Sequence, residues 1–142
     1  MVLKRICLFV LLGLIAAQPL GADQSKEVEA TAAARSWLLL VDDQSYTDSW
    51  ERADPYFKNA VTLDQWKKSL LLVRKPLGAV LSRKLISRQY LRSLPGAPDG
   101  EYVVIQYGTR FENGGASVET ITGLLDPDGV WRVAGYYIKP GG

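Results

Sequence analysis

The order of the sequence patterns predicts an α+β fold, with about three helices packed on one face of a four-stranded antiparallel sheet. Apolar residues recur at helical spacing up to residue 75 and then alternate from Val80 onward. The alternating part is divided by three turn sequences, Leu94 to Gly100, Asn113-Gly114-Gly115 and Asp126-Pro127-Asp128-Gly129. Helices that precede strands joined by short turns indicate separate layers rather than alternating strand and helix units.

Two helices are expected in the first part of the fold. Residues 25–42 repeat apolar positions at intervals of three and four, among several alanines that favour helix. Tyr46 and Trp50 are four residues apart and predict a short second helix. Asp54-Pro55 either stops this helix or starts a further turn, because proline fits the first position of a helix and not its interior.

The third helix begins with a capping-box pattern. Thr62 is followed three residues later by Gln65, so the helix is expected to start at Leu63. It is expected to bury Trp66 and to end before Pro76, since proline and the glycine after it interrupt helices.

Four strands are expected, at residues 80–94, 101–111, 117–125 and 130–138. Alternation places the apolar residues of each strand on one face. In the last strand it puts Trp131, Val133 and Tyr137 on the same side. The predicted core of the sheet is Val103, Ile105, Tyr107, Trp131 and Val133.

The first 22 residues have the pattern of a secretory signal that is cleaved before Asp23. Lys4 and Arg5 precede an apolar run of 12 residues, from Ile6 to Ala17. This run is shorter than the roughly 20 residues that cross a bilayer, so no stable membrane span is expected after cleavage. Residues 23–142 are expected to form a single domain that is periplasmic or secreted.

The composition excludes several classes of enzyme. The chain has no histidine and one cysteine, Cys7, which lies in the predicted signal. Ser-His-Asp and Cys-His mechanisms, and thiolate or imidazole sites for zinc, copper or haem, are therefore excluded from residues 23–142. The acidic pairs lack the spacing of a calcium loop, and no Gly-rich phosphate loop joins a strand to a helix. No cofactor and no metal is expected.

Charge is strongly segregated along the chain. Residues 65–98 hold eight bases and no acid, and the acidic flanks make residues 23–142 formally neutral. This run is a candidate surface for an anionic envelope component, such as a phospholipid headgroup or a polysaccharide. Its candidate residues are Arg74, Arg83, Arg88 and Arg92. The alternative is a structural role, in which the bases pair with the acidic flanks. Nucleic acid is not an expected partner, because few exposed aromatic residues interleave the bases.

Several motifs between residues 37 and 138 occur in a recognisable combination. They are Trp37-Leu38, Ser49-Trp50, Phe57, Trp66, Arg74, Pro76-Leu77-Gly78, Arg83, Leu94 to Tyr102, Glu119-Thr120 and Gly129 to Ile138. Together they resemble the bacterial family called domain of unknown function 4019, over essentially all of residues 23–142. The resemblance implies a short exported protein without assigned activity or catalytic residues. The element order is also similar to the nuclear transport factor 2-like fold, a cone of curved sheet closed by helices.

An apolar pocket that holds a carboxyl group is the remaining route to catalysis. Glu119 lies in the middle of a predicted strand and is a candidate base for proton transfer, with Tyr107 or Tyr137 as hydrogen-bond donor. The alternative is that Glu119 is solvated, or pairs with Arg83 or Arg110 across strands. The residues proposed to line the pocket are Trp50, Trp66, Tyr107, Glu119 and Tyr137. For the aromatic residues, the alternative is a place in the core.

The sequence therefore predicts a small exported module that binds a component of the bacterial cell envelope, or helps to organise it, without catalysis. The alternative function is a cone-shaped enzyme that uses a carboxylate and a tyrosine to move a proton on an apolar ligand. A small ligand or an anionic envelope component is the expected partner, and no pattern in the sequence indicates the oligomeric state.

Overall fold

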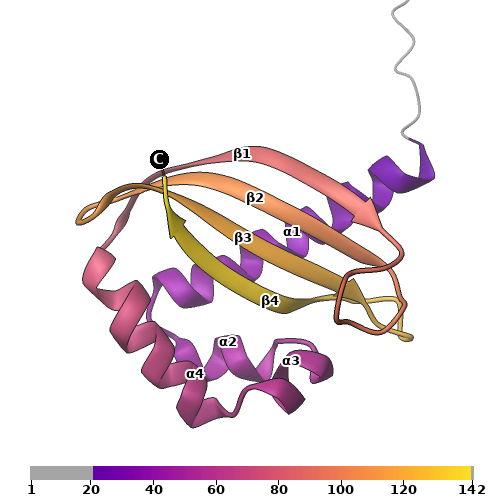
Figure 1. Ribbon diagram of the computed structural model, residues 1–142, viewed down its shortest axis with the longest axis horizontal. Helices are drawn as coiled ribbons and strands as arrows, with labels where there is room; N and C mark the ends of the chain where they lie inside the picture. Colours follow the sequence, from indigo (N-terminus) through magenta and orange to yellow (C-terminus); the bar gives the residue numbers. More distant parts are fainter. Residues whose placement is uncertain (1–20, 142) are drawn as a thin grey trace, which may run out of the picture.

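A computed structural model describes residues 21–141 as four α-helices followed by a four-stranded antiparallel sheet (Figure 1). The predicted signal, residues 1–22 with Cys7, lies almost entirely outside the described residues. The helices precede the strands, and the predicted α+β class is confirmed. The closure of the sheet into a cone stays a prediction.

The helices are α1 (Ala22–Asp42), α2 (Tyr46–Glu51), α3 (Pro55–Ala60) and α4 (Leu63–Ser69), followed by a π-helical segment (Leu70–Arg74) and a 3-10 turn (Lys75–Leu77). The capping box before α4 is confirmed, since the Thr62 hydroxyl accepts a hydrogen bond from the Gln65 N–H at 3.2 Å. The helical path continues past the predicted end, because Pro76 lies at the beginning of the 3-10 turn.

One helix more is present than the three expected. Asp54 accepts a hydrogen bond from the Tyr56 N–H at 2.8 Å, and Pro55 takes the first helical position. This cap and the fixed φ of proline start α3 where the sequence left open a stop or a new turn.

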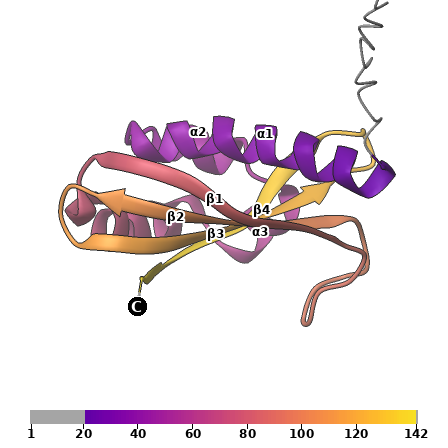
Figure 2. The same cartoon turned by 90° about the horizontal axis from the view of Figure 1, so that it is seen from above.

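The strands are β1 (Val80–Leu91), β2 (Tyr102–Phe111), β3 (Gly115–Leu125) and β4 (Trp131–Pro140), hydrogen-bonded in chain order. Helix α1 lies across one face of the sheet and contacts all four strands, whereas α2 to α4 lie along the β4 edge (Figures 1 and 2). No helix of residues 21–141 covers the opposite face (Figure 2). Functional side chains that point toward α1 are therefore enclosed between the helix and the sheet.

Packing of α1 on the sheet forms the core. The five predicted core residues of the sheet are all buried, as are Trp37 and Trp66 from the helices. The rings of these two tryptophans are 5.9 Å apart, and both indole N–H groups bond to Ser49, one to its carbonyl at 2.8 Å and one to its hydroxyl at 2.9 Å. The tryptophans thus serve the core and have their polar groups satisfied inside it.

A β-bulge in β4 changes the face on which the residues after Val133 lie. Thr122 pairs with Gly135 and the next residue of β3 pairs with Val133, which leaves Ala134 as an extra residue. Tyr136 therefore turns toward the core, and Tyr137 is 49% exposed. The predicted side of Tyr137 was wrong, because alternation holds only in a strand without a bulge.

Candidate functional site

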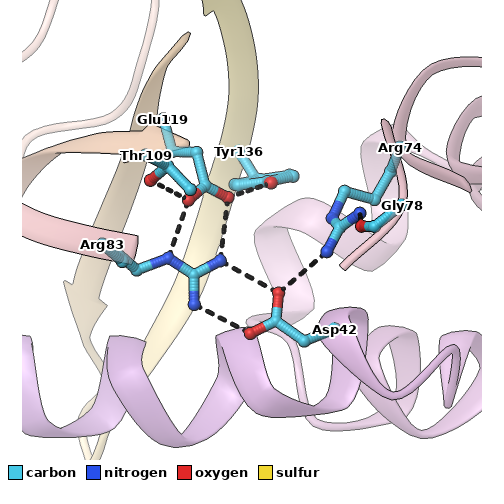
Figure 3. Close-up of polar contacts among 7 residues, drawn as sticks. All are labelled: Asp42, Arg74, Gly78, Arg83, Thr109, Glu119 and Tyr136. Carbon is cyan, nitrogen blue, oxygen red and sulfur yellow. Dashed lines mark hydrogen bonds and ion pairs between the residues drawn. The ribbon is translucent and has the colours of Figure 1, made fainter. Parts of the chain in front are cut away.

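Two carboxylates and two guanidinium groups meet between α1 and the sheet (Figure 3). Asp42 ends α1, Arg74 ends the π-helical segment, Arg83 lies near the start of β1, and Glu119 lies in β3. Alternation in the two strands points Arg83 and Glu119 toward the face that α1 covers. We call these four residues the ion network.

Glu119 is fully buried, and both of its carboxylate oxygens are occupied. Arg83 donates from Nε to Oε1 at 2.7 Å and from Nη2 to Oε2 at 3.2 Å. The hydroxyls of Thr109 and Tyr136 donate to Oε1 and Oε2 respectively, each at 2.5 Å. A buried carboxylate is strongly destabilising without such partners, so these four bonds explain how the core accommodates Glu119.

Asp42 joins the two arginines of the ion network. It accepts hydrogen bonds from Nη1 and Nη2 of Arg83 at 2.8 and 2.9 Å, and from Nη2 of Arg74 at 3.2 Å. Arg74 is 3% exposed, donates to the Gly78 carbonyl at 2.6 Å and stacks 4.6 Å from the centre of the Phe111 ring. Two cations and two anions are therefore balanced inside the ion network.

Two members of this arrangement have altered proton affinities. Burial disfavours the charged form of Arg83, but its hydrogen bonds to Asp42 and Glu119 outweigh burial and raise the pKa of Arg83. Burial, followed by the negative charge of Glu119, raises the pKa of Tyr136 well above its usual range. Arg83 thus stays charged and Tyr136 stays neutral over the physiological pH range.

A groove opens beside the ion network, between α1 and β1. Its volume is about 700 Å³, which lies within the range of small-molecule sites. Its lining includes three arginines, Arg35, Arg83 and Arg88, and three leucines, Leu38, Leu39 and Leu85. The groove therefore offers both positive charge and apolar surface to a ligand.

A β-bulge in β1 places Arg88 on the groove side. Leu85 pairs with Tyr107 and Ser87 pairs with Gln106, the residue before Tyr107 in β2, which leaves Ile86 as an extra residue. Without the bulge, Ser87 rather than Arg88 would share the face of Leu85. The bulge thus brings a second arginine of β1 into the groove.

Tyr107 lines the groove, and its buried hydroxyl has no hydrogen-bond partner among residues 21–141. Buried polar groups are nearly always paired, so an unpaired hydroxyl at a groove marks a place for a ligand atom or water. Burial raises the pKa of Tyr107 in spite of the nearby charges of Arg35 and Arg83. The hydroxyl is therefore protonated and available as a donor.

The four arginines proposed from the sequence lie in three environments. Arg74 and Arg83 belong to the ion network, and Arg88 lines the groove, with Glu27 at 3.9 Å. Arg92 is exposed beyond the end of β1, in a hollow that it shares with Glu101. The acid-free run is therefore not one continuous cationic surface.

The five residues proposed for a pocket are not gathered in one cavity. Trp66 and Tyr137 line a hollow of about 260 Å³ between α4 and β4, whereas Tyr107 lines the groove. Trp50 is partly buried at the edge of the core and donates to a backbone carbonyl at 2.8 Å. Glu119 lines neither of these hollows.

The predicted alternative for Glu119, a pairing with Arg83, is confirmed. Sequence reasoning missed Asp42 and Arg35, and it did not link Tyr136 to Glu119. Arg35 and Asp42 are seven residues apart and so share a face of α1, which is the one sequence signal that links them. No local pattern links either residue to β1 or β3.

No group of three or more acidic, histidine or cysteine side chains within residues 21–141 is arranged to hold a metal ion. In the same part of the chain, every helix is too short or too polar to cross a membrane.

A family model described as "Protein of unknown function (DUF4019)" matches residues 33–136. The matched range contains the whole ion network, the three arginines of the groove and Tyr107. No curated protein matches the chain.

Proposed function

The chain belongs to the DUF4019 family, and we propose that it is an exported, non-catalytic binding module whose groove holds the anionic end of a small ligand. Export is proposed from the secretory pattern of residues 1–22. The observation that carries the binding proposal is the unpaired Tyr107 hydroxyl in a groove lined by Arg35 and Arg88.

Arg35 and Arg88 supply the excess positive charge of the groove. Arg83 also lines it, but the two carboxylates of the ion network balance its charge. Glu27 is 3.9 Å from Arg88, and Arg35 makes no salt bridge within residues 21–141. An incoming anion therefore gains more from Arg35 and Arg88 than from Arg83.

The apolar part of the lining favours a ligand with a hydrocarbon body. Leu39 is 59% exposed and Leu85 is 44% exposed, and both line the groove. Covering such surface contributes about 25 cal/mol for each Å² removed from water. A carboxylate or phosphate head on an apolar chain would thus meet the arginines, the Tyr107 hydroxyl and the leucines together.

Proton transfer by Glu119 is less well supported. A catalytic base needs a free lone pair directed at the substrate. Both oxygens of Glu119 are already bonded to Arg83, Thr109 and Tyr136. The carboxylate also lines neither the groove nor the hollow beside α4. These bonds favour a structural role for Glu119.

Calorimetric titration with octanoate and octyl phosphate, compared with octanol, tests the proposal. At least one anionic probe should bind, and octanol should bind about tenfold or more weakly. A hydrogen bond to a charged group contributes about 1.5–3 kcal/mol, and 1.4 kcal/mol is a tenfold change in affinity. The double variant Arg35→Gln/Arg88→Gln should weaken binding of the anionic probe by a similar factor.

Lys84→Gln is the matched control for these two substitutions. Lys84 lies between Arg83 and Leu85 in β1, so it points to the opposite face of the strand. Its replacement should leave the affinity unchanged. The proposal is refuted if neither anionic probe binds the wild-type chain, or if Lys84→Gln weakens binding as much as the double variant does.

A further inference from the structure

Three consecutive apolar side chains face outward from the π-helical segment Leu70–Arg74. Leu71 is 48% exposed, Leu72 is 79% exposed and Val73 is 52% exposed. A helix that only packs on a core has a narrower apolar stripe, and a run of exposed apolar residues is unfavourable in water unless it has a use. We therefore expect this apolar face to be covered by a binding partner.

The outward positions are fixed by anchors at both ends of the segment. Leu70 is 3% exposed in the core, and Arg74 is held by Asp42 at 3.2 Å and by the Gly78 carbonyl at 2.6 Å. The wider π-helical turn accommodates three residues between these anchors without turning them inward. The two anchors thus hold the apolar side chains in their outward positions.

Lysines border the exposed apolar residues. Lys67 and Lys68 lie in the last turn of α4, and Lys75 follows the segment. All three are exposed, and none makes a salt bridge with a residue of 21–141. Residues 65–75 contain no acid. We call Leu71, Leu72, Val73 and the three lysines the lysine-framed patch.

The lysine-framed patch continues onto β4. Val73, Tyr137 and Ile138 line the same hollow of about 260 Å³. Tyr137 is 49% exposed, and the Nζ atom of Lys139 lies 5.5 Å from the centre of its ring. An exposed tyrosine beside lysines and leucines is typical of surfaces at a membrane interface, where the ring lies among the headgroups.

From these observations we infer that the lysine-framed patch docks on the surface of a bilayer that contains anionic phospholipids. Leu71 and Leu72 enter the boundary between headgroups and acyl chains, and the lysines contact lipid phosphates. Charge complementarity selects this partner, because every charged residue of the stretch 65–75 is a base. The surface is formed by α4, the π-helical segment and β4, so the inference goes beyond the binding proposed for the groove.

Vesicle flotation tests the inference. The probes are vesicles of equimolar phosphatidylglycerol and phosphatidylcholine, compared with vesicles of phosphatidylcholine alone. The full chain is tested beside the chain from Asp23 onward, so that binding through the first 22 residues is measured separately. The shorter chain keeps all the core residues found within residues 21–141. The shorter chain should bind the anionic vesicles about tenfold more strongly than the neutral ones.

Two variants separate the apolar and the cationic parts of the patch. Leu71→Gln/Leu72→Gln and Lys67→Gln/Lys68→Gln/Lys75→Gln should each weaken binding to the anionic vesicles by about tenfold. Leu81→Gln/Ile86→Gln is the matched control, because these β1 residues are 65% and 58% exposed but lie outside the patch. The control should bind as the wild type does, and all three variants should melt near the wild-type temperature.

The inference is overturned if the wild-type chain shows no preference for anionic vesicles, or if the control loses as much binding as the patch variants. It is also overturned if sedimentation shows a wild-type dimer that Leu71→Gln/Leu72→Gln dissociates while vesicle binding is unchanged. That result would assign the patch to an interface between two copies of the chain.

Discussion

Arg83 and Arg88 lie on the same face of β1, yet their surroundings differ. The side chain of Arg83 is enclosed by the ion network, whereas that of Arg88 lines the groove. Arg83 is bonded to two carboxylates at distances between 2.7 and 3.2 Å. Arg88 lines the groove and has one distant carboxylate, at 3.9 Å. Two arginines five residues apart thus have different roles, the first as part of the interior and the second as a charge of the groove with one distant partner.

The difference shows that a basic run in a sequence does not define a surface. What decides the role of each arginine is the number of acidic side chains that the fold brings within reach. Asp42 in α1 and Glu119 in β3 both form ion pairs with Arg83, so its charge is neutralised inside the protein. A buried pair of this kind is sensitive to loss of one partner, whereas an exposed charge is not.

The largest effect on stability is expected when Arg83 is removed from the ion network. Arg83→Met should destabilise the fold by about 3–5 kcal/mol, because it leaves the buried Glu119 without its cation. Arg88→Met should change the free energy of unfolding by less than about 0.5 kcal/mol. Urea denaturation of both variants measures the contrast, and equal losses would contradict it.

A double variant sharpens the same test. Arg83→Met/Glu119→Met removes both charges of the pair and should regain part of the stability that Arg83→Met loses, since a buried pair can often be replaced by apolar residues. A loss equal to the sum of the two single losses would show that the pair is not coupled.

The next largest effect on stability is expected at Tyr136, whose hydroxyl donates a hydrogen bond to Glu119. Tyr136→Phe should destabilise the fold by about 1.5–3 kcal/mol, because it removes a hydrogen bond to a buried charged group. Tyr137→Phe is the neighbouring control, since Tyr137 is 49% exposed, and it should change stability by less than about 0.5 kcal/mol. Thermal melting of both proteins checks this, and a larger loss in Tyr137→Phe would reverse the assignment of the two faces.

The smallest effect comes from a buried acid that has no cation bonded to it. Asp54 is 2% exposed and caps α3, and burial together with the neighbouring carboxyl of Asp126 raises its pKa to about 6. The folded state therefore keeps a proton that the unfolded state releases above its pKa of about 4. The free energy of unfolding therefore falls as the pH rises from about 4 to about 6, and it stays at the lower value above pH 6.

Asp54→Asn keeps the cap and removes the titration. The variant should match the wild type near pH 4 and exceed its free energy of unfolding by on the order of 1 kcal/mol near pH 7. Denaturant unfolding at both pH values measures the difference. A difference between the two proteins that does not change with pH would contradict the raised pKa.

Local patterns were sufficient to predict the fold. Turn sequences and alternation act within a few residues, so the four strands and their buried residues could be placed from the sequence. The bulges at Ile86 and Ala134 could not be placed in the same way, because an extra residue in one strand is defined only against its partner. That is why Tyr136, and not Tyr137, meets Glu119.

The site was predictable only in part. The sequence left open whether Glu119 is buried or solvated, and it offered Arg83 as one candidate partner across strands. Asp42 meets Arg83 across 41 residues of sequence, and Glu119 meets it across 36, so the full network depends on how α1 docks on the sheet. Tertiary contacts of this kind leave no periodic signal in a single sequence.

The order of the strands has a consequence for how the chain folds. Each strand pairs with the one before it, through two short turns and the loop at residues 92–101, so the sheet requires little loop-closure entropy. The contacts that α1 makes with all four strands join residues far apart in the sequence. We therefore expect the docking of α1 on the sheet to carry most of the loop-closure cost of folding, and the contact between Asp42 and Arg83 to form when that docking is complete.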